Sequence, residues 1–157
     1  MPYRKVEVDD LPDVPSPARE KTEIDEAVGA TTFGCNLYVL DPGEPASFGY
    51  HKHPEHEELF YVLDGTLEFE TEDGVWTVGA NEAFFVPPNH AQQGQAIGDD
   101  PARLLAIGAP KVDDRPVFVE TCSECGETGD REIEQRDGTF TLCCANCGAE
   151  TGRFETT

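Results

Sequence analysis

Three of the four histidines lie within six residues, at His51, His53 and His56. Side chains alternate along an extended strand, so His51 and His53 would project from one face and could chelate a single ion. A proline follows His53, and Glu58 opens the next apolar run. Two imidazoles and a carboxylate with open coordination positions are typical of non-haem iron(II) sites, although zinc, manganese, nickel and copper also occupy such sets. The spacing alone also fits a solvated, histidine-rich loop on an acidic surface.

The six cysteines include two pairs, Cys122-x-x-Cys125 and Cys144-x-x-Cys147, which are separated by 18 residues. In this pattern each Cys-x-x-Cys turn supplies two thiolates to one tetrahedral zinc ion, and the glycine after each pair permits the tight turn. Disulfides and an iron–sulfur centre are the alternatives, and a reducing cytosol disfavours disulfides. Cys143 adjoins Cys144, and the regular spacing predicts that Cys144 is the ligand and Cys143 a spare thiol.

Between residues 31 and 109, short runs rich in Phe, Val, Leu and Tyr alternate with turn signals. The turn signals are Asp41-Pro42-Gly43, Asp64-Gly65, Asp73-Gly74 and Gly98-Asp99-Asp100-Pro101. Short strands at this spacing predict an antiparallel sandwich or barrel. Both faces of the run from 58 to 63 are apolar, which is typical of a strand between two layers. We therefore predict an all-β protein.

The segments that flank this region differ from it in composition. Residues 1–28 are polar and contain four prolines, which predicts a mostly irregular segment with one short strand at Tyr3–Val8. A charged connector at 111–116 precedes a cysteine-bearing segment, in which Arg136-Asp137-Gly138 predicts a hairpin turn. The predicted organisation is an irregular segment at 1–28, a barrel at 29–110, a linker at 111–116 and a metal-stabilised unit at 117–157.

The chain of 157 residues carries 11 Lys and Arg against 32 Asp and Glu, a formal net charge of −21. This excess argues against binding nucleic acid or an anionic membrane, since both need clustered cations. The start of the chain lacks the apolar core of a secretory signal, and no apolar run is long enough to span a bilayer, so we expect a cytoplasmic protein. The acids are spread along the whole chain, which predicts adaptation to a salt-rich, halophilic cytoplasm where the repulsion is screened.

One stretch of the sequence resembles a known motif. His51-x-His53, four residues, Glu58, six residues and Gly65 resemble the first motif of the cupin superfamily, including the strand and hairpin from 58 to 65. The resemblance covers roughly residues 31–109. It implies a double-stranded β-helix (jelly-roll) barrel with a divalent metal (Fe, Mn, Ni or Zn) in its mouth, held by His51, His53 and Glu58. It also implies a homodimer.

The second cupin motif is altered. The family pattern is Gly, five residues, Pro, one residue, Gly, two residues, His, and Asn81, Pro87, Asn89 and Gln92 stand at those positions here. Asparagine tolerates a positive φ better than other non-glycine residues, so both turns can form. An amide oxygen is a harder and weaker ligand than imidazole for late transition metals. The fourth ligand is therefore either Gln92, at the family position, or His90, two residues earlier.

The C-terminal segment resembles a zinc ribbon. About 40 residues bury too little apolar surface to fold unaided, so the resemblance implies zinc as the stabilising element. Residues 118–157 carry nine acids and three arginines, a net charge of −6, which is poor for binding nucleic acid. A structural cap, an oligomer contact and a protein-docking module are the open roles for this ribbon.

Two functions from different classes remain open. The first is a metal-binding module that takes a small oxygenated ligand in the barrel, and the second is a metal-dependent enzyme of the dioxygenase or isomerase type. His56 and Glu57 flank the candidate ligands and are expected at the surface. We expect core positions for the remaining residues of interest, which are Cys35, Trp76, Phe84 and Phe85.

Overall fold

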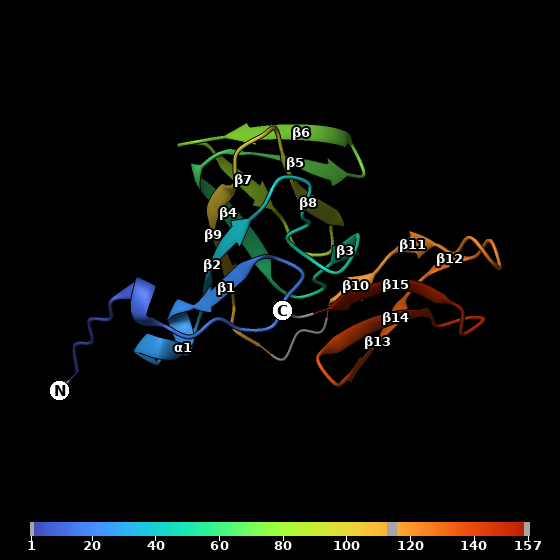
Figure 1. Cartoon of the computed structure of the whole chain (residues 1–157), viewed down its shortest axis with the longest axis horizontal. Helices are drawn as coiled ribbons and strands as arrows, with labels where there is room; N and C mark the ends of the chain where they lie inside the picture. Colours follow the sequence, from blue (N-terminus) through green and yellow to red (C-terminus); the bar gives the residue numbers. More distant parts are fainter. Residues whose placement is uncertain (1, 113–115, 156–157) are drawn as a thin grey trace.

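The computed structural model describes residues 2–112 and 116–155, and nearly all of its regular structure is β-strand. Two five-stranded sheets face each other (Figure 1). In order across the first sheet, the strands are β1 (Glu20–Glu23), β2 (Gly34–Leu40), β9 (Ala102–Ala109), β4 (Glu57–Asp64) and β7 (Ala83–Val86). In order across the second, they are β10 (Val117–Phe118), β3 (His51–Lys52), β8 (Gln92–Ile97), β5 (Thr66–Thr71) and β6 (Gly74–Gly79).

The C-terminal ribbon, residues 120–155, lies beside the second sheet (Figure 1). Its strands are β11 (Glu120–Thr121), β12 (Thr128–Gly129), β13 (Arg131–Arg136), β14 (Thr139–Cys144) and β15 (Glu150–Glu155). Asp137 (φ 50°) and Gly138 (φ 76°) make the predicted hairpin turn between β13 and β14. The predicted all-β fold, a barrel followed by a small ribbon, is confirmed.

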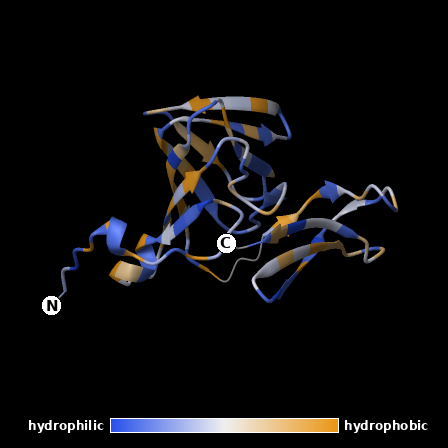
Figure 2. Ribbon diagram, in the orientation of Figure 1, coloured by the Kyte–Doolittle hydropathy of each residue, from blue (hydrophilic) through white to orange (hydrophobic). Residues whose placement is uncertain are grey.

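The core lies between the two sheets. Its largest fully buried side chain is Phe69, whose ring lies 4.9 Å from that of Phe60 and 4.6 Å from that of Phe84. Val62, on the same inward face of β4 as Phe60, is also fully buried. Figure 2 shows apolar residues interspersed with polar ones along the strands, as expected where one face of each sheet meets the core.

The N-terminal segment differs from the prediction. The expected strand at Tyr3–Val8 is wrong, because residues 3–7 form no regular element and Val8–Asp10 is a short 3-10 helix. The strand lies later, at β1, which pairs antiparallel with β2 and is followed by helix α1 (Ile24–Val28). Edge pairing with β2 stabilises this charged sequence as a strand, although its composition gives no strand signal. The edge strands β1 and β10 both lie outside residues 29–110.

A buried ion pair connects α1 to the end of β9. Asp25 is 4% exposed, and its Oδ2 lies 2.6 Å from Lys111 Nζ. Burial raises the pKa of the Asp25 carboxyl, but the hydrogen bonds from Lys111 and from the backbone of Cys35 outweigh it and leave the pKa below its ordinary value. The carboxylate therefore stays charged and anchors the start of the connector to the barrel.

Among the described residues, no helix is long and apolar enough to cross a membrane.

Gly65 closes the hairpin between β4 and β5 at φ 77°, and a Cβ there would lie 2.7 Å from the Cα of Ala102 and from the carbonyl oxygen of Pro101. Gly98 has φ 85° with no neighbour within 4 Å of an added Cβ, so it is a matched control. We expect Gly98→Ala to lower the free energy of unfolding by about 1 kcal/mol, the cost of a left-handed backbone. Gly65→Ala should cost at least about 1 kcal/mol more, from the collision with backbone. Urea denaturation in high salt measures both, and equal losses would contradict the packing role of Gly65.

Candidate metal centres

The structure brings His51, His53 and Glu58 together at the open end of the barrel. One ligand atom from each of the three residues lies within 4.8 Å of the other two. The Nε2 of His53 is 3.5 Å from Glu58 Oε1, and the rings of His51 and His53 are 5.0 Å apart and nearly perpendicular. His51 lies on the second sheet and Glu58 on the first, so the cluster joins the two layers. We call these three residues the barrel cluster.

Two features of the barrel cluster suit a metal. The Nδ1 of His51 lies 2.8 Å from the carbonyl oxygen of Gly49, which can only accept, so the Nδ1–H donates to it and Nε2 is the ring nitrogen left to face the cluster. Burial raises the pKa of the Glu58 carboxyl, but the neighbouring imidazoles, His56 first, outweigh it and the pKa lies below its ordinary value. A neutral imidazole and an ionised carboxylate are the forms that bind metal.

Of the two candidates for the fourth position, the structure places Gln92 at the barrel cluster. Gln92 pairs with His51 across β8 and β3, is 3% exposed, and donates from Nε2 to Glu58 Oε2 over 3.3 Å. His90 is exposed, its Nδ1 lies 2.9 Å from the carbonyl oxygen of Pro88, and it lines a separate cavity beside β6 and β7.

The two asparagines of the altered motif adopt the predicted conformation. Asn81 has φ 66° and Asn89 has φ 63°, in the left-handed region that glycine usually occupies. The N–H of Asn89 donates to the carbonyl oxygen of His53 over 2.7 Å. The loop between β7 and β8 therefore holds the backbone of a cluster residue without needing glycine.

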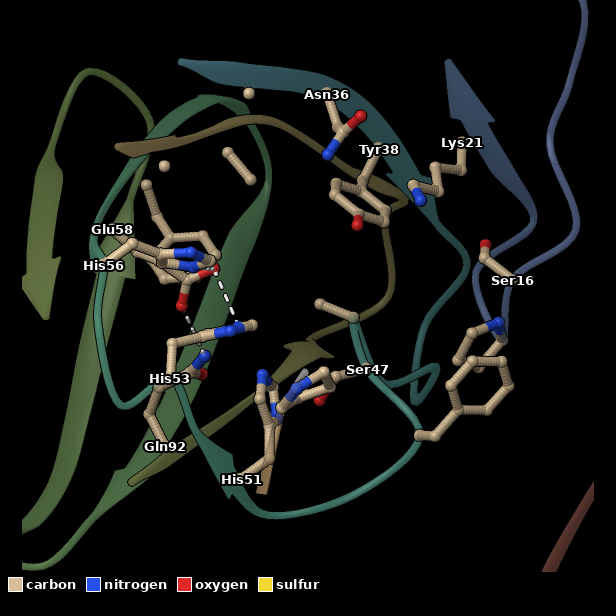
Figure 3. Close-up of a pocket in the computed structure, with 18 of the residues that line it drawn as sticks. Ser16, Lys21, Asn36, Tyr38, Ser47, His51, His53, His56, Glu58 and Gln92 are labelled. Atoms are coloured by element: carbon tan, nitrogen blue, oxygen red, sulfur yellow. Dashed lines mark hydrogen bonds and ion pairs between the residues drawn. The ribbon is translucent and has the colours of Figure 1, made fainter. Parts of the chain in front are cut away.

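The predicted surface position of His56 is wrong. We expected it at the surface, but its side chain is only 16% exposed, its ring stacks on that of His53 at 4.0 Å, and its Nε2 lies 3.9 Å from Glu58 Oε1 (Figure 3). The two-residue alternation of a strand was the available signal, because His56 and Glu58 share one face if the strand is extended by one residue. Glu57, of opposite parity, is exposed as expected.

The barrel cluster lines a cavity of about 350 Å³. Across it from the imidazoles lie Asn36 and Tyr38, on the inward face of β2, and Lys21 on β1, which pairs with Tyr38 (Figure 3). Burial, then the charges of Glu58 and Glu23, raise the pKa of the Tyr38 phenol, so its hydroxyl stays protonated and can donate a hydrogen bond. The cavity therefore has the barrel cluster on one side and hydrogen-bond donors on the other.

The aromatic side chains of β6 and β7 divide between core and surface. Phe84 packs against the core as expected. The expectation was wrong for Trp76 and Phe85, which are 53% and 52% exposed. Phe85 pairs with the exposed Leu59 on the outer face of the first sheet, opposite to the inward Phe84, and Trp76 lies on β6, the last strand of the second sheet.

The four cysteines of the two pairs form a second cluster, in the ribbon. The Sγ atoms of Cys122 and Cys147 are 3.8 Å apart, as are those of Cys125 and Cys144. A metal with bonds of about 2.3 Å to four tetrahedral thiolates requires sulfur atoms about 3.75 Å apart, whereas a disulfide needs about 2.05 Å. All six cysteines are free thiols. The four-cysteine cluster therefore fits one tetrahedral ion.

Hydrogen bonds to sulfur favour the thiolate form of Cys125. Asn146 Nδ2 lies 3.5 Å from Cys125 Sγ. This bond, followed by one from the backbone of Glu127, lowers the pKa of the Cys125 thiol to about 6. Cys143 lies outside the four-cysteine cluster, as the spacing predicted.

Comparison with known proteins agrees with this geometry. A family model described as "Cupin domain" matches residues 36–108. The chain is 31% identical over 104 residues to Protein SchB of Streptomyces halstedii, an alignment that covers 64% of this chain and 74% of SchB. This chain belongs to the cupin superfamily. The jelly-roll barrel that the first motif implied is therefore confirmed, with the barrel cluster on the motif residues.

Two other matches differ in how much of each chain they cover. The chain is 32% identical over 78 residues to polyketide synthase CurC of Streptomyces cyaneus, covering 50% of this chain and 49% of CurC, so it spans about half of that relative's length. A crystal structure titled as a sugar phosphate isomerase from a cupin superfamily, from Silicibacter pomeroyi, superposes with a TM-score of 0.64. It covers 94% of this chain and 92% of its own at 20% identity, a likeness of fold alone.

The adjacent residues Cys143 and Cys144 give a matched test of the ribbon site. Cys144→Ser removes one of four converging thiolates, so we expect zinc affinity at the ribbon to fall at least tenfold. Cys143→Ser should leave zinc content unchanged. Elemental analysis and the thiolate-to-cobalt charge-transfer band of cobalt-substituted protein report the site directly. Equal zinc loss in both variants would show that the ligand set is wrong.

Proposed function

We propose that this chain is a metal-binding cupin that takes a small oxygenated ligand in its barrel, with zinc held by the four-cysteine cluster of the ribbon. The observation that carries the proposal is the convergence of His51, His53 and Glu58, within 4.8 Å of one another, on a cavity of about 350 Å³. Mixed nitrogen and oxygen ligands suit iron, manganese, nickel or zinc. A bound ion would supply a Lewis acid for ligand oxygens.

Gln92 completes the surroundings of the ion in this proposal. Its amide nitrogen donates to Glu58 Oε2. Rotation of the buried amide by half a turn would present its oxygen to the ion instead, and the two orientations differ only in which end faces the cluster. Because an amide oxygen is a weak ligand, the ion keeps positions open for oxygens of a ligand.

The far wall of the cavity supports an oxygenated ligand. Asn36 and the protonated Tyr38 offer hydrogen-bond donors, and the ammonium of Lys21 lies in the same row as Tyr38. A ligand that chelates the ion with two oxygens and carries further oxygens would contact both walls. Phe60 and Ala106 add apolar surface to the cavity lining.

A metal-dependent enzyme of the isomerase or dioxygenase type is the second candidate. Tyr38 favours it, because a phenol kept protonated inside the cavity can donate a proton to a metal-bound substrate. The same side chain also serves a purely binding role, so it supports both candidates.

The first test is the metal content of the protein, kept in high salt because of its net charge of −21. We expect two metal ions per chain in the wild type and in His90→Ala, whose side chain lies in the other cavity. The double variant His51→Ala/His53→Ala should hold one, at the four-cysteine cluster. A single ion in all three proteins would falsify the barrel metal site.

The second test is ligand binding, with acetohydroxamate as a bidentate oxygen probe of the cobalt-loaded protein. Tyr38→Phe removes a donor from the cavity wall and should weaken probe binding about fivefold, the worth of one hydrogen bond. Tyr61→Phe is the matched control, because the Tyr61 hydroxyl donates to Asn81 outside the cavity. Calorimetric titration measures both, and equal affinities would contradict the role of Tyr38.

A further inference from the structure

Strand β10, which leads into the ribbon, forms part of the wall of the metal-binding cavity. Phe118 on β10 pairs with His51 on β3, and their rings are 5.6 Å apart. Phe118 is 3% exposed and lines the cavity. Its backbone N–H donates to Asp130 Oδ1 over 3.0 Å, which joins β10 to the ribbon. The imidazole of His51 therefore rests on a residue that the ribbon holds in place.

A carboxylate of the ribbon holds the peptide that orients His51. Glu120 Oε1 accepts from the backbone N–H of Tyr50 over 2.9 Å, and the N–H of Val119 donates to the Tyr50 carbonyl over 2.8 Å. A Cβ at Gly49 would lie 2.8 Å from Glu120 Oε1, so the carboxylate approaches this backbone closely. The carbonyl of Gly49 is the one that fixes His51 Nδ1. A line of direct contacts thus runs from Glu120 to the metal-facing imidazole.

Glu120 is itself held by Arg131 on β13, the strand that pairs with β14. Arg131, 4% exposed, donates from Nη2 to the Glu120 carbonyl over 2.9 Å, and its Nε lies 3.8 Å from Glu120 Oε2. Arg131 pairs with Cys144 across β13 and β14, and Cys122 follows Glu120 by two residues. Glu120 and Arg131 therefore both lie close to cysteines of the four-cysteine cluster.

An aromatic contact attaches the ribbon to the barrel at a second point. The ring of Phe48, in the loop before β3, lies 4.7 Å from that of Phe140 on β14 and 5.3 Å from that of Phe154 on β15. Phe48 also lines the cavity. Among the described ribbon residues, the buried side chains are Cys122, Arg131, Leu142 and Cys144, too few apolar groups for a core that folds without metal.

From these contacts we propose that the ribbon supports the wall of the barrel site from outside the cavity, with Glu120 and Phe118 as positioning residues for His51. Metal at the four-cysteine cluster then sets the geometry and the affinity of the barrel cluster, although the two clusters share no ligand. The ribbon face that carries Phe140 and Phe154 is occupied by Phe48 of the same chain, which favours this role over docking of another protein through that face.

The inference rests on the proposed barrel metal, so its test needs one measurement that does not require that metal. Glu120→Ala removes the acceptor for Tyr50 and keeps every cysteine, whereas Cys125→Ser/Cys147→Ser removes the ribbon ion. Glu132→Ala, at an exposed position of β13, is the matched control. The first measurement is amide hydrogen exchange of residues 47–52 in the full-length protein, and the second is cobalt(II) affinity of the barrel cluster.

We expect faster amide exchange at residues 47–52 in Glu120→Ala and in the double cysteine variant. In Glu132→Ala the exchange rate should equal that of the wild type. Barrel affinity for cobalt(II) should fall about tenfold in both, as for other groups that orient metal-binding histidines. Unchanged exchange in both variants would overturn the inference. Faster exchange in a protein whose barrel holds no metal even in the wild type would support the ribbon's positioning role and reject the proposed function instead.

Discussion

The candidate site depends on two β-sheets being held face to face, because its ligands come from both. His51 belongs to the second sheet and Glu58 to the first, and neither strand alone places more than part of the set. The apolar layer around Phe69 keeps the sheets together below the cluster. At the open end, where polar groups replace that layer, a cation between His51 and Glu58 would bridge the sheets.

Polar side chains replace apolar ones in a regular order along the inward face of the first sheet. On β4 the inward residues run from Val62 through Phe60 to Glu58. Apolar core side chains are thus followed by a carboxylate of the barrel cluster within three alternate positions. On β2 the same direction ends at Tyr38 and Asn36. Because one strand face serves both the core and the cavity, the rigid packing of the core fixes the direction in which the polar residues point.

The ribbon adds a second constraint at β3, which is a short strand. Strand β3 has only two residues, and β8 contributes a single residue pair to it. Pairing with β10 and the hydrogen bond to Glu120 supply most of the remaining backbone support for His51. A short ligand-bearing strand of this kind needs outside anchors, because few backbone hydrogen bonds of its own limit its motion.

The sequence by itself predicted the all-β fold class from short strands and turn signals, and the four-cysteine cluster from the Cys-x-x-Cys spacing, because both depend on local patterns. Spacing alone left the three residues of the barrel cluster open to a solvated loop, and the resemblance to the first cupin motif singled them out. The sequence did not place β1, whose charged residues become a strand only by pairing with β2. Only the tertiary structure placed Gln92 rather than His90 beside the barrel cluster, because Gln92 pairs with His51 across β8 and β3, whereas His90 precedes β8 and lines a separate cavity. It also brought the ring of His56 against that of His53. The hydrogen bond from the Tyr50 N–H to Glu120, next to β3, joins residues 70 positions apart.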